Sequence, residues 1–360
     1  MFCHAFVKGQ PLSLLDDFCC TSFSSSKRTT MQQHALCAVL ALVVRGAFAG
    51  GPCEDPEQCV ALKTAAGPLM MPSVALGTWR GSYGECADND YVCVRAKAKA
   101  SVASWLTLPG GTHIDGANDY RTQVEIGEAI AGTDREALFL TTKCPGPMGF
   151  RATIQCAEDN LQMLGLYGVN TSGYIDLLLV HFPFVIKPEC YGVATSAACA
   201  GDGAYEDPGA AARQETWKAM EALVKYGKVK AIGLSDYNST QIAETLAVAT
   251  MPISLHQVEW NPKTHDDAML ELCEKHGIQL QAWSPLGGAA GSVLADPTVE
   301  AIAKAHAVST AQVTLKWSLQ RGVAIVTGTD KPEHMASDLD LWGFTLSDGE
   351  VAKISALQSA

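Results

Sequence analysis

A carboxylate and a phenol lie close together in the segment GGTHIDGANDYRTQVEIGEAI, which covers residues 110–130. A short apolar stretch ends on Asp115, and Tyr120 follows just before a helix-like pattern begins. A tyrosine hydroxyl can donate a proton in general acid catalysis, and a buried carboxylate can hold a neighbouring cation in place. A structural interpretation also fits, in which Asp115 caps the next element and Tyr120 packs on the surface.

Other apolar stretches of the chain also end on polar or aromatic side chains. These residues are Lys143, His181, Ser235, Asp236, Gln257, Glu259, Trp283 and Ser284. Taken singly, Lys143 is explained as a solvated strand end and His181 as a hydrogen-bonded core histidine. Taken together, the repeated pattern predicts one rim on which these groups converge.

Eight short apolar stretches alternate with helical patterns over most of the chain. We expect strands at 73–77, 112–115, 138–141, 175–180, 229–233, 255–258, 279–282 and 324–326. This alternation predicts an α/β fold, a (β/α)8 TIM barrel with an N-terminal β-hairpin, whose active site lies at the C-terminal ends of the strands. An open doubly wound sheet is the rival, but the GxGxxG motif expected after its first strand is missing.

The motifs on these strands resemble those of the aldo-keto reductase family, from about Val60 to the C-terminus. They are, in chain order, MPSVALGTW, HIDGANDY, LFLTTK, YIDLLLVHFP, AMEALVKYGKVKAIGLSDYN, LHQVEWNP and LQAWSPLGG. The resemblance implies the (β/α)8 barrel and an NAD(P)H-dependent reduction of aldehydes or ketones to alcohols. It also implies that Asp115, Tyr120, Lys143 and His181 are the catalytic residues.

The implied chemistry needs these residue types. Hydride from the nicotinamide reaches the carbonyl carbon, and Tyr120 protonates the oxygen. The usual tyrosine pKa of about 10 is high for this task, so we expect Lys143 to lower it. Asp115 would keep Lys143 charged, and His181 would donate a hydrogen bond that orients the carbonyl. The resemblance implies no metal.

The resemblance also implies a set of residues that hold the nicotinamide nucleotide and the substrate. The cofactor-binding positions are Gly77, Thr78, Ser235, Asp236, Gln257, Trp283, Ser284, Leu286, Thr329, His334 and Asp338. Trp79 and Phe182 match walls of the substrate pocket. Asp236 stands where the family usually has Asn, and a carboxylate cannot donate to the carboxamide oxygen. Trp283 stands where Tyr is commoner, and either offers an aromatic face.

The largest departure from the family lies in VTGTDKPEHMASDL, near the last strand. Two cations that usually surround the adenosine 2′-phosphate are replaced by Gly328 and His334. Each lost charged hydrogen bond is worth about 1.5–3 kcal/mol, or about ten- to a hundredfold in affinity. Lys331 could compensate, and Thr329 can still donate. We expect NADP as the cofactor, while the use of NAD stays open.

The chain divides into three parts. Residues 1–49 are expected to be a targeting leader, because Ala35–Val44 has the length of a signal-peptide apolar region and Ala47-Phe48-Ala49 fits a cleavage site. The alternative is a gene model that begins too early, which would leave the protein in the cytoplasm. Residues 50–59 form a short linker, and residues 60–360 form the barrel, with a long loop at about 185–216 that we expect to cover the rim.

The cysteines favour an oxidising compartment, either the secretory route or an organelle. Three pairs close in sequence are candidates for disulfides: Cys53 with Cys59, Cys86 with Cys93, and Cys190 with Cys199. Three further cysteines fall in or near regular elements and are expected to be buried thiols, namely Cys144, Cys156 and Cys273. The spacings do not form a CxxC zinc motif.

Composition excludes some classes of function. The 360 residues carry a net charge of −12 with no Lys/Arg cluster, which argues against a nucleic-acid partner. No apolar run in the mature part is long enough to span a bilayer. The resemblance implies a small carbonyl compound as the substrate, and we expect a monomer. The alternative functions are a non-catalytic barrel that binds nicotinamide nucleotide for regulation, and a degenerate barrel without cofactor.

Overall fold

The computed structural model describes residues 51–53, 55–81, 86–87, 90–167, 173–190, 201–288 and 292–358. Its strands are β1 (Cys59–Thr64), β2 (Gly67–Pro72), β3 (Val74–Gly77), β4 (His113–Asp115), β5 (Phe139–Cys144), β6 (Ile175–Val180), β7 (Val185–Ile186), β8 (Tyr205–Glu206), β9 (Val229–Ser235), β10 (Leu255–Glu259), β11 (Gln279–Trp283) and β12 (Ala324–Thr327). Its α-helices are α3 (Tyr91–Trp105), α4 (Gln123–Ile130), α5 (Phe150–Met163), α6 (Gly209–Lys225), α7 (Ser239–Leu246), α8 (Asp267–His276), α9 (Pro297–His306), α10 (Thr310–Gln320), α11 (Pro332–Leu339) and α12 (Asp348–Ser355).

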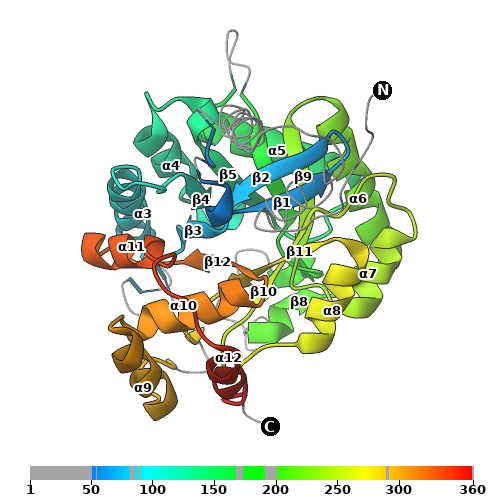
Figure 1. The fold of residues 1–360 in the computed structure, drawn as a ribbon. Helices are drawn as coiled ribbons and strands as arrows, with labels where there is room; N and C mark the ends of the chain where they lie inside the picture. The colour runs from blue at the N-terminus through cyan, green and yellow to red at the C-terminus, as the bar shows by residue number, and fades with distance from the viewer. Residues whose placement is uncertain are drawn as a thin grey trace, which may run out of the picture.

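Eight parallel strands close into a barrel in the order β3, β4, β5, β6, β9, β10, β11, β12, with helices around the outside (Figure 1). Closure is made where β12 pairs with β3, with Ile325 opposite Val74. The expected (β/α)8 barrel is therefore confirmed, and each expected strand overlaps an observed one. Parallel strands buried on both faces need continuous apolar runs, which is why these short stretches could be found in the sequence. No helix within the described parts of the chain is long and apolar enough to cross a membrane.

The N-terminal hairpin of β1 and β2 covers one end of the barrel (Figure 1). Leu62 and Met71 of the hairpin are fully buried and form one apolar cluster with residues of the barrel strands. These barrel residues are Phe139, Leu177, Leu179, Ala231, Leu255 and Ala324. The hairpin therefore closes the N-terminal end and leaves the C-terminal end, where the polar rim was expected, for a site.

Several outer helices start at side chains that satisfy their first backbone N–H groups. Asn238, Ser309 and Ser347 each form a reciprocal capping box with the Gln or Glu three residues later. At the other end of α8, Gly277 takes a left-handed conformation with φ of 67°, which glycine adopts without steric cost. These caps fix the helix boundaries and hence the lengths of the loops that reach the rim.

The long connection after β6 is shorter than expected, because α6 already begins at Gly209. Within the connection, β7 pairs antiparallel with β8, so that Val185 lies opposite Glu206. Cys190 is disulfide-bonded, but the expected partner, Cys199, lies outside the described residues. The leader at residues 1–49 also lies outside them.

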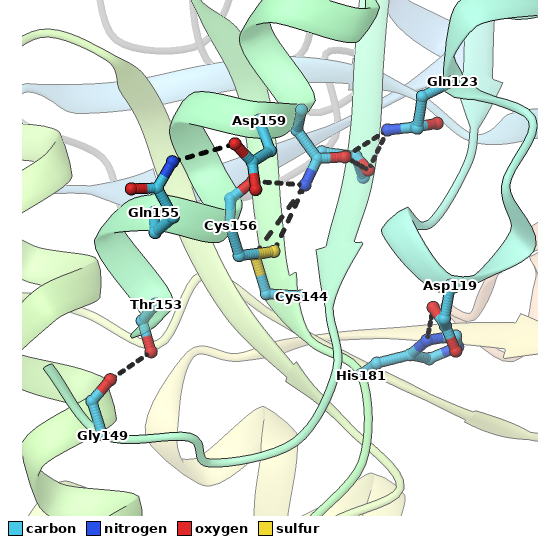
Figure 2. The surroundings of a disulfide bond; sticks show 11 residues. Asp119, Gln123, Cys144, Gly149, Thr153, Gln155, Cys156, Asp159 and His181 are labelled. Carbon is cyan, nitrogen blue, oxygen red and sulfur yellow. Dashed lines mark hydrogen bonds and ion pairs between the residues drawn. A yellow bond between two sulfur atoms is a disulfide. The ribbon is translucent and has the colours of Figure 1, made fainter. Parts of the chain in front are cut away.

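Three disulfides are present among the described residues. Cys53–Cys59 and Cys86–Cys93 are confirmed. The expectation of buried thiols was wrong for Cys144 and Cys156, which form a third disulfide with their Cα atoms 6.0 Å apart (Figure 2). Helix α5 packs against β5, the strand that precedes it, and this brings the two cysteines together. Cys273 is a buried free thiol, as expected.

The Cys144–Cys156 bond should contribute measurably to stability, because it closes a loop over a sequence separation of 12 residues. We expect Cys144→Ala combined with Cys156→Ala to lower the free energy of unfolding by about 2–4 kcal/mol in urea titrations. Cys273→Ala is the matched control, since it shortens an equally buried cysteine that makes no cross-link. Equal losses in the two proteins would contradict a contribution from the cross-link.

Candidate active site

The C-terminal ends of the barrel strands surround a cavity of about 420 Å³. It is lined by three of the four expected catalytic residues, Asp115, Tyr120 and His181, and by most of the expected cofactor and pocket positions. The latter are Gly77, Thr78, Trp79, Phe182, Ser235, Asp236, Gln257, Trp283, Ser284 and Leu286. Residues from seven strands or their following loops thus meet in one space, as the strand-end pattern predicted.

Lys143, the fourth expected catalytic residue, is fully buried next to Asp115. Its ammonium group forms an ion pair with Asp115 Oδ1 and donates a second hydrogen bond to the carbonyl oxygen of Gly116 at 3.0 Å. The other oxygen, Asp115 Oδ2, accepts from Gln257 Nε2 at 2.8 Å. The same nitrogen donates to Gln281 Oε1, also at 2.8 Å. Both amide hydrogens of Gln257 are therefore used within the barrel, and only its oxygen can serve a ligand, as an acceptor.

Tyr120 ends a 3-10 turn, Asn118–Tyr120, and the chain then turns sharply at Arg121, whose φ is 57°. The turn brings the Tyr120 ring within 5.4 Å of the Trp79 ring. Lys143 Nζ lies 5.2 Å from the centre of the Tyr120 ring.

The pKa of Tyr120 moves in the direction opposite to the one expected from Lys143. Burial is the largest cause, and the carboxylates of Asp115, Asp119 and Asp236 add to it, so that the pKa lies well above its usual value of 10. Lys143 does not reverse this shift because its charge is already compensated by Asp115. Tyr120 is therefore fully protonated at neutral pH, which is the form that a proton donor must have.

His181 follows β6 directly, and its ring is held from two sides. Nδ1 lies 2.8 Å from Asp119 Oδ1, as Figure 2 shows. Nε2 lies 3.5 Å from Tyr120 Oη, and the His181 ring stacks on Phe182 with a centroid distance of 3.9 Å. The imidazole thus presents one nitrogen to the tyrosine hydroxyl and the other to a carboxylate.

Asp236, which follows β9, and Trp283, at the end of β11, form a hydrogen-bonded pair on the barrel rim. Trp283 Nε1 donates to Asp236 Oδ1 at 2.9 Å, and Asp236 adopts a left-handed backbone with φ of 58°. Burial raises the pKa of Asp236, while the hydrogen bond from Trp283 and the nearby charge of His181 act against this shift. Ser235 Oγ lies 3.4 Å from Asp236 Oδ2.

Three expected cofactor positions lie beyond Gly328, where the cavity ends. Thr329 is buried, and its carbonyl oxygen accepts from Arg80 Nη2 at 2.8 Å. His334 is exposed on α11. Asp338 is buried one turn later and accepts from Thr327 Oγ1 at 2.6 Å.

Comparison with known proteins agrees with this geometry. The model of the Aldo/keto reductase family matches residues 73–359. The chain belongs to the aldo/keto reductase family. It is therefore an oxidoreductase, and the matched region includes every expected site residue from Gly77 to Asp338.

Members of the aldo/keto reductase family from distant organisms resemble the chain over most of their length. Aldo-keto reductase family 1 member A1 of Cricetulus griseus is 31% identical over 325 residues, which is 83% of this chain and 89% of that protein. The NADP-dependent D-sorbitol-6-phosphate dehydrogenase of Malus domestica is 30% identical over 82% of this chain and 93% of its own. The crystal structure of a Bombyx mori aldo-keto reductase in complex with NADP has a TM-score of 0.67 at 28% identity, covering 84% of this chain and 93% of that one.

Sequence reasoning missed two residues that contribute to the site. Asp119 precedes Tyr120 and contacts His181; its carboxylate in the HIDGANDY motif was a visible signal. Arg80 follows Trp79, is buried, lines the cavity and crosses to the β12 end of the barrel. A Cβ atom at Gly328 would lie only 3.2 Å from Arg80 Nη1, so the missing side chain at Gly328 leaves room for the guanidinium.

Asp338 should make the stability of the protein depend on pH. Burial raises its pKa to about 6, although the hydrogen bond from Thr327 and the charge of His334 oppose the shift. Because the carboxyl of an unfolded chain titrates near 3.9, the unfolded state releases this proton first, and stability falls as pH rises from about 4 to 6. Asn at this position stays neutral and can still accept from Thr327.

We therefore expect Asp338→Asn to be more stable than the wild type by about 2–3 kcal/mol at pH 8, with the difference disappearing towards pH 4. Urea titrations of both proteins across this pH range measure the difference. A difference that does not change with pH would contradict the raised pKa of Asp338.

Proposed function

We propose that this member of the aldo/keto reductase family reduces aldehydes or ketones to alcohols with NADPH, and that Tyr120 supplies the proton. The observation that carries the proposal is the placement of the Tyr120 hydroxyl beside His181 Nε2 in a cavity whose wall also contains Asp115. A proton donor, a hydrogen-bonding imidazole and a charge-compensated ammonium group are what carbonyl reduction requires of the protein.

The residues around the cavity fit a nicotinamide nucleotide. Asp236 and Gln257 offer acceptors for the carboxamide NH2 group, and the hydroxyl groups of Ser235 and Ser284 are further polar partners. Glycines at positions 77 and 328 leave the walls free of side chains; a Cβ at Gly77 would lie 2.9 Å from Val326. Close packing of the cavity wall against Val326 and Arg80 therefore favours glycine at both positions.

A reduced nicotinamide supplies hydride to the carbonyl carbon when it is bound. As negative charge grows on the carbonyl oxygen, Tyr120 Oη delivers the proton that makes the alcohol. His181 lies beside this hydroxyl and orients the oxygen. The Asp115–Lys143 pair places a fixed, compensated charge beneath the tyrosine ring, and Trp79 and Phe182 form the apolar wall next to it.

NADP is the cofactor that we assign, with NAD as the competitor. The Bombyx mori relative was solved with NADP, and the Malus domestica relative is named as NADP-dependent. Arg80 is a cation within the cavity wall, close to Gly328, where the resemblance to the family implies that a cation is missing. Lys331 is exposed at the start of α11 and adds a second positive charge on the same side.

We also assign residues 1–49 as a leader that sends the protein to an oxidising compartment. The three disulfides of the described residues support this assignment, because such bonds persist in the secretory route and not in the cytosol. The mature protein is then a barrel of residues 60–360 preceded by the short segment that carries Cys53.

Expression of the full chain in a eukaryotic secretory host tests the leader. We expect the protein in the medium, with an N-terminus near Gly50 when it is read by mass spectrometry. Recovery of the protein inside the cell with residues 1–49 attached would contradict the assignment.

Tyr120→Phe tests the proton donor and the cofactor together. We expect kcat for reduction of small aldehydes to fall by about 10²–10⁴-fold, because the phenyl ring cannot donate a proton. Loss of the near-ultraviolet absorbance of NADPH or NADH measures turnover, and quenching of tryptophan fluorescence measures nucleotide binding. Binding should persist in the variant, with NADPH preferred. Turnover that survives the substitution would contradict the role of Tyr120, and equal use of both nucleotides would contradict the cofactor assignment.

A further inference from the structure

Asp119 is an acidic residue of the site to which the reaction described so far gives no role. Its Oδ1 atom lies 2.8 Å from His181 Nδ1, and its side chain is one-third exposed, at 33%, while that of His181 is 8% exposed (Figure 2). Burial alone would raise the pKa of Asp119, but the charge and the hydrogen bond of His181 hold it below its usual value. Asp119 is therefore an ionised carboxylate, which can only accept hydrogen bonds.

The contact fixes which nitrogen of His181 carries a proton. Because Asp119 cannot donate, the 2.8 Å contact requires a proton on Nδ1. A neutral imidazole has only one N–H, so Nε2 of the neutral ring is a bare acceptor. In that state Nε2 can receive a hydrogen bond from Tyr120 Oη, 3.5 Å away, but it cannot donate to a carbonyl oxygen in the cavity.

We propose that Asp119 is a positioning residue that keeps His181 protonated on Nδ1, so that Nε2 donates to the carbonyl oxygen only when the ring is an imidazolium. The proposal rests on the proposed carbonyl reduction for its functional meaning, but the protonation pattern is a property of the protein alone. Asp119 then has two effects: it sets the orientation of the ring, and it provides the counter-charge of the active form.

The other charged and titratable groups that face His181 do not replace Asp119. Tyr120 on the same turn is protonated and neutral, and Lys143 on β5 is compensated by its ion pair with Asp115. Asp236, after β9, interacts with His181 through charge, but its oxygens are hydrogen-bonded to Trp283 and Ser235. The carboxylate in direct contact with the ring is that of Asp119.

The proposal has a defined pH dependence. The imidazolium form of His181 carries a proton on both nitrogens, so Nε2 donates; in the neutral form, Asp119 holds the remaining proton on Nδ1 and Nε2 cannot donate. The kcat/KM for carbonyl reduction should therefore fall as Nε2 is deprotonated. In Asp119→Asn the amide NH2 can donate to Nδ1, which allows a neutral ring with the proton on Nε2 and hence a flatter profile.

The first test is the protonation pattern in the wild-type full chain without nucleotide or substrate. We would label histidine with ¹⁵N, assign His181 by comparison with His181→Gln, and follow both ring nitrogens by long-range ¹H–¹⁵N correlation across pH. We expect Nδ1 to stay protonated while Nε2 titrates. A neutral ring with its proton on Nε2 would overturn the proposal, even if the enzyme reduces carbonyl compounds.

The second test compares Asp119→Asn with Asp134→Asn, a matched substitution of an exposed carboxylate that caps the turn at Arg135–Ala137. We expect the maximal kcat/KM of Asp119→Asn to fall about tenfold or more, the loss of one hydrogen bond to a charged group. Its pH profile should flatten, and its neutral His181 should carry the proton on Nε2. Asp134→Asn should match the wild type.

A loss of activity in Asp119→Asn that is equal at every pH, with an unchanged His181 spectrum, would show a merely structural role and overturn the proposal. Failure of the proposed function would be a separate result. In that case the wild-type protein would oxidise no reduced nicotinamide nucleotide with any carbonyl compound, whatever its His181 spectrum shows. The wild-type spectrum reports the protonation state of His181 directly, so the proposal can be tested even if Asp119→Asn does not fold.

Discussion

The ion pair between Lys143 and Asp115 is the interaction on which the site depends. Both side chains are inside the barrel, where an unpaired charge is very costly, so each is held by the other. The pair is extended by Gln257, which joins Asp115 to Gln281 across neighbouring strands. A buried polar network of this kind fixes the relative height of β4, β5, β10 and β11, because each strand contributes a side chain that has no other place to satisfy its polar atoms.

The two ends of the barrel differ in what covers them, and this difference leaves room for the polar network at one end. The hairpin residues Leu62 and Met71 add an apolar layer at the N-terminal end, and the polar residues that line the cavity lie at the C-terminal end. Asp115 lines the cavity at the C-terminal end together with aromatic side chains such as Trp79 and Phe182. In this setting the pKa of Tyr120 is raised by burial first and by the carboxylates of Asp115, Asp119 and Asp236 second.

Sequence reasoning found the fold and the members of the site for physical reasons. Parallel barrel strands must be apolar and must end on the residues that do chemistry, so Asp115, Lys143 and His181 could be located by pattern alone. Sequence reasoning could not find contacts between side chains that only tertiary packing brings together. The disulfide of Cys144 with Cys156, the contact of Asp119 with His181 and the path of Arg80 to Thr329 all depend on how a loop or helix folds back on a strand. The direction of the Tyr120 pKa shift depends first on burial and then on three carboxylates, and both follow from tertiary packing.

The three disulfides share a feature that concerns how the chain matures. They join cysteines separated by 6, 7 and 12 residues, so each lies within one contiguous piece of the chain. Each can therefore form as soon as its segment has left the ribosome, before the last strand exists to meet the first. The seam between β3 and β12, by contrast, joins residues about 250 positions apart and is held by hydrogen bonds and packing within the described residues. None of these three cross-links needs the ring to be closed, whereas pairing of β12 with β3 needs nearly the whole barrel sequence.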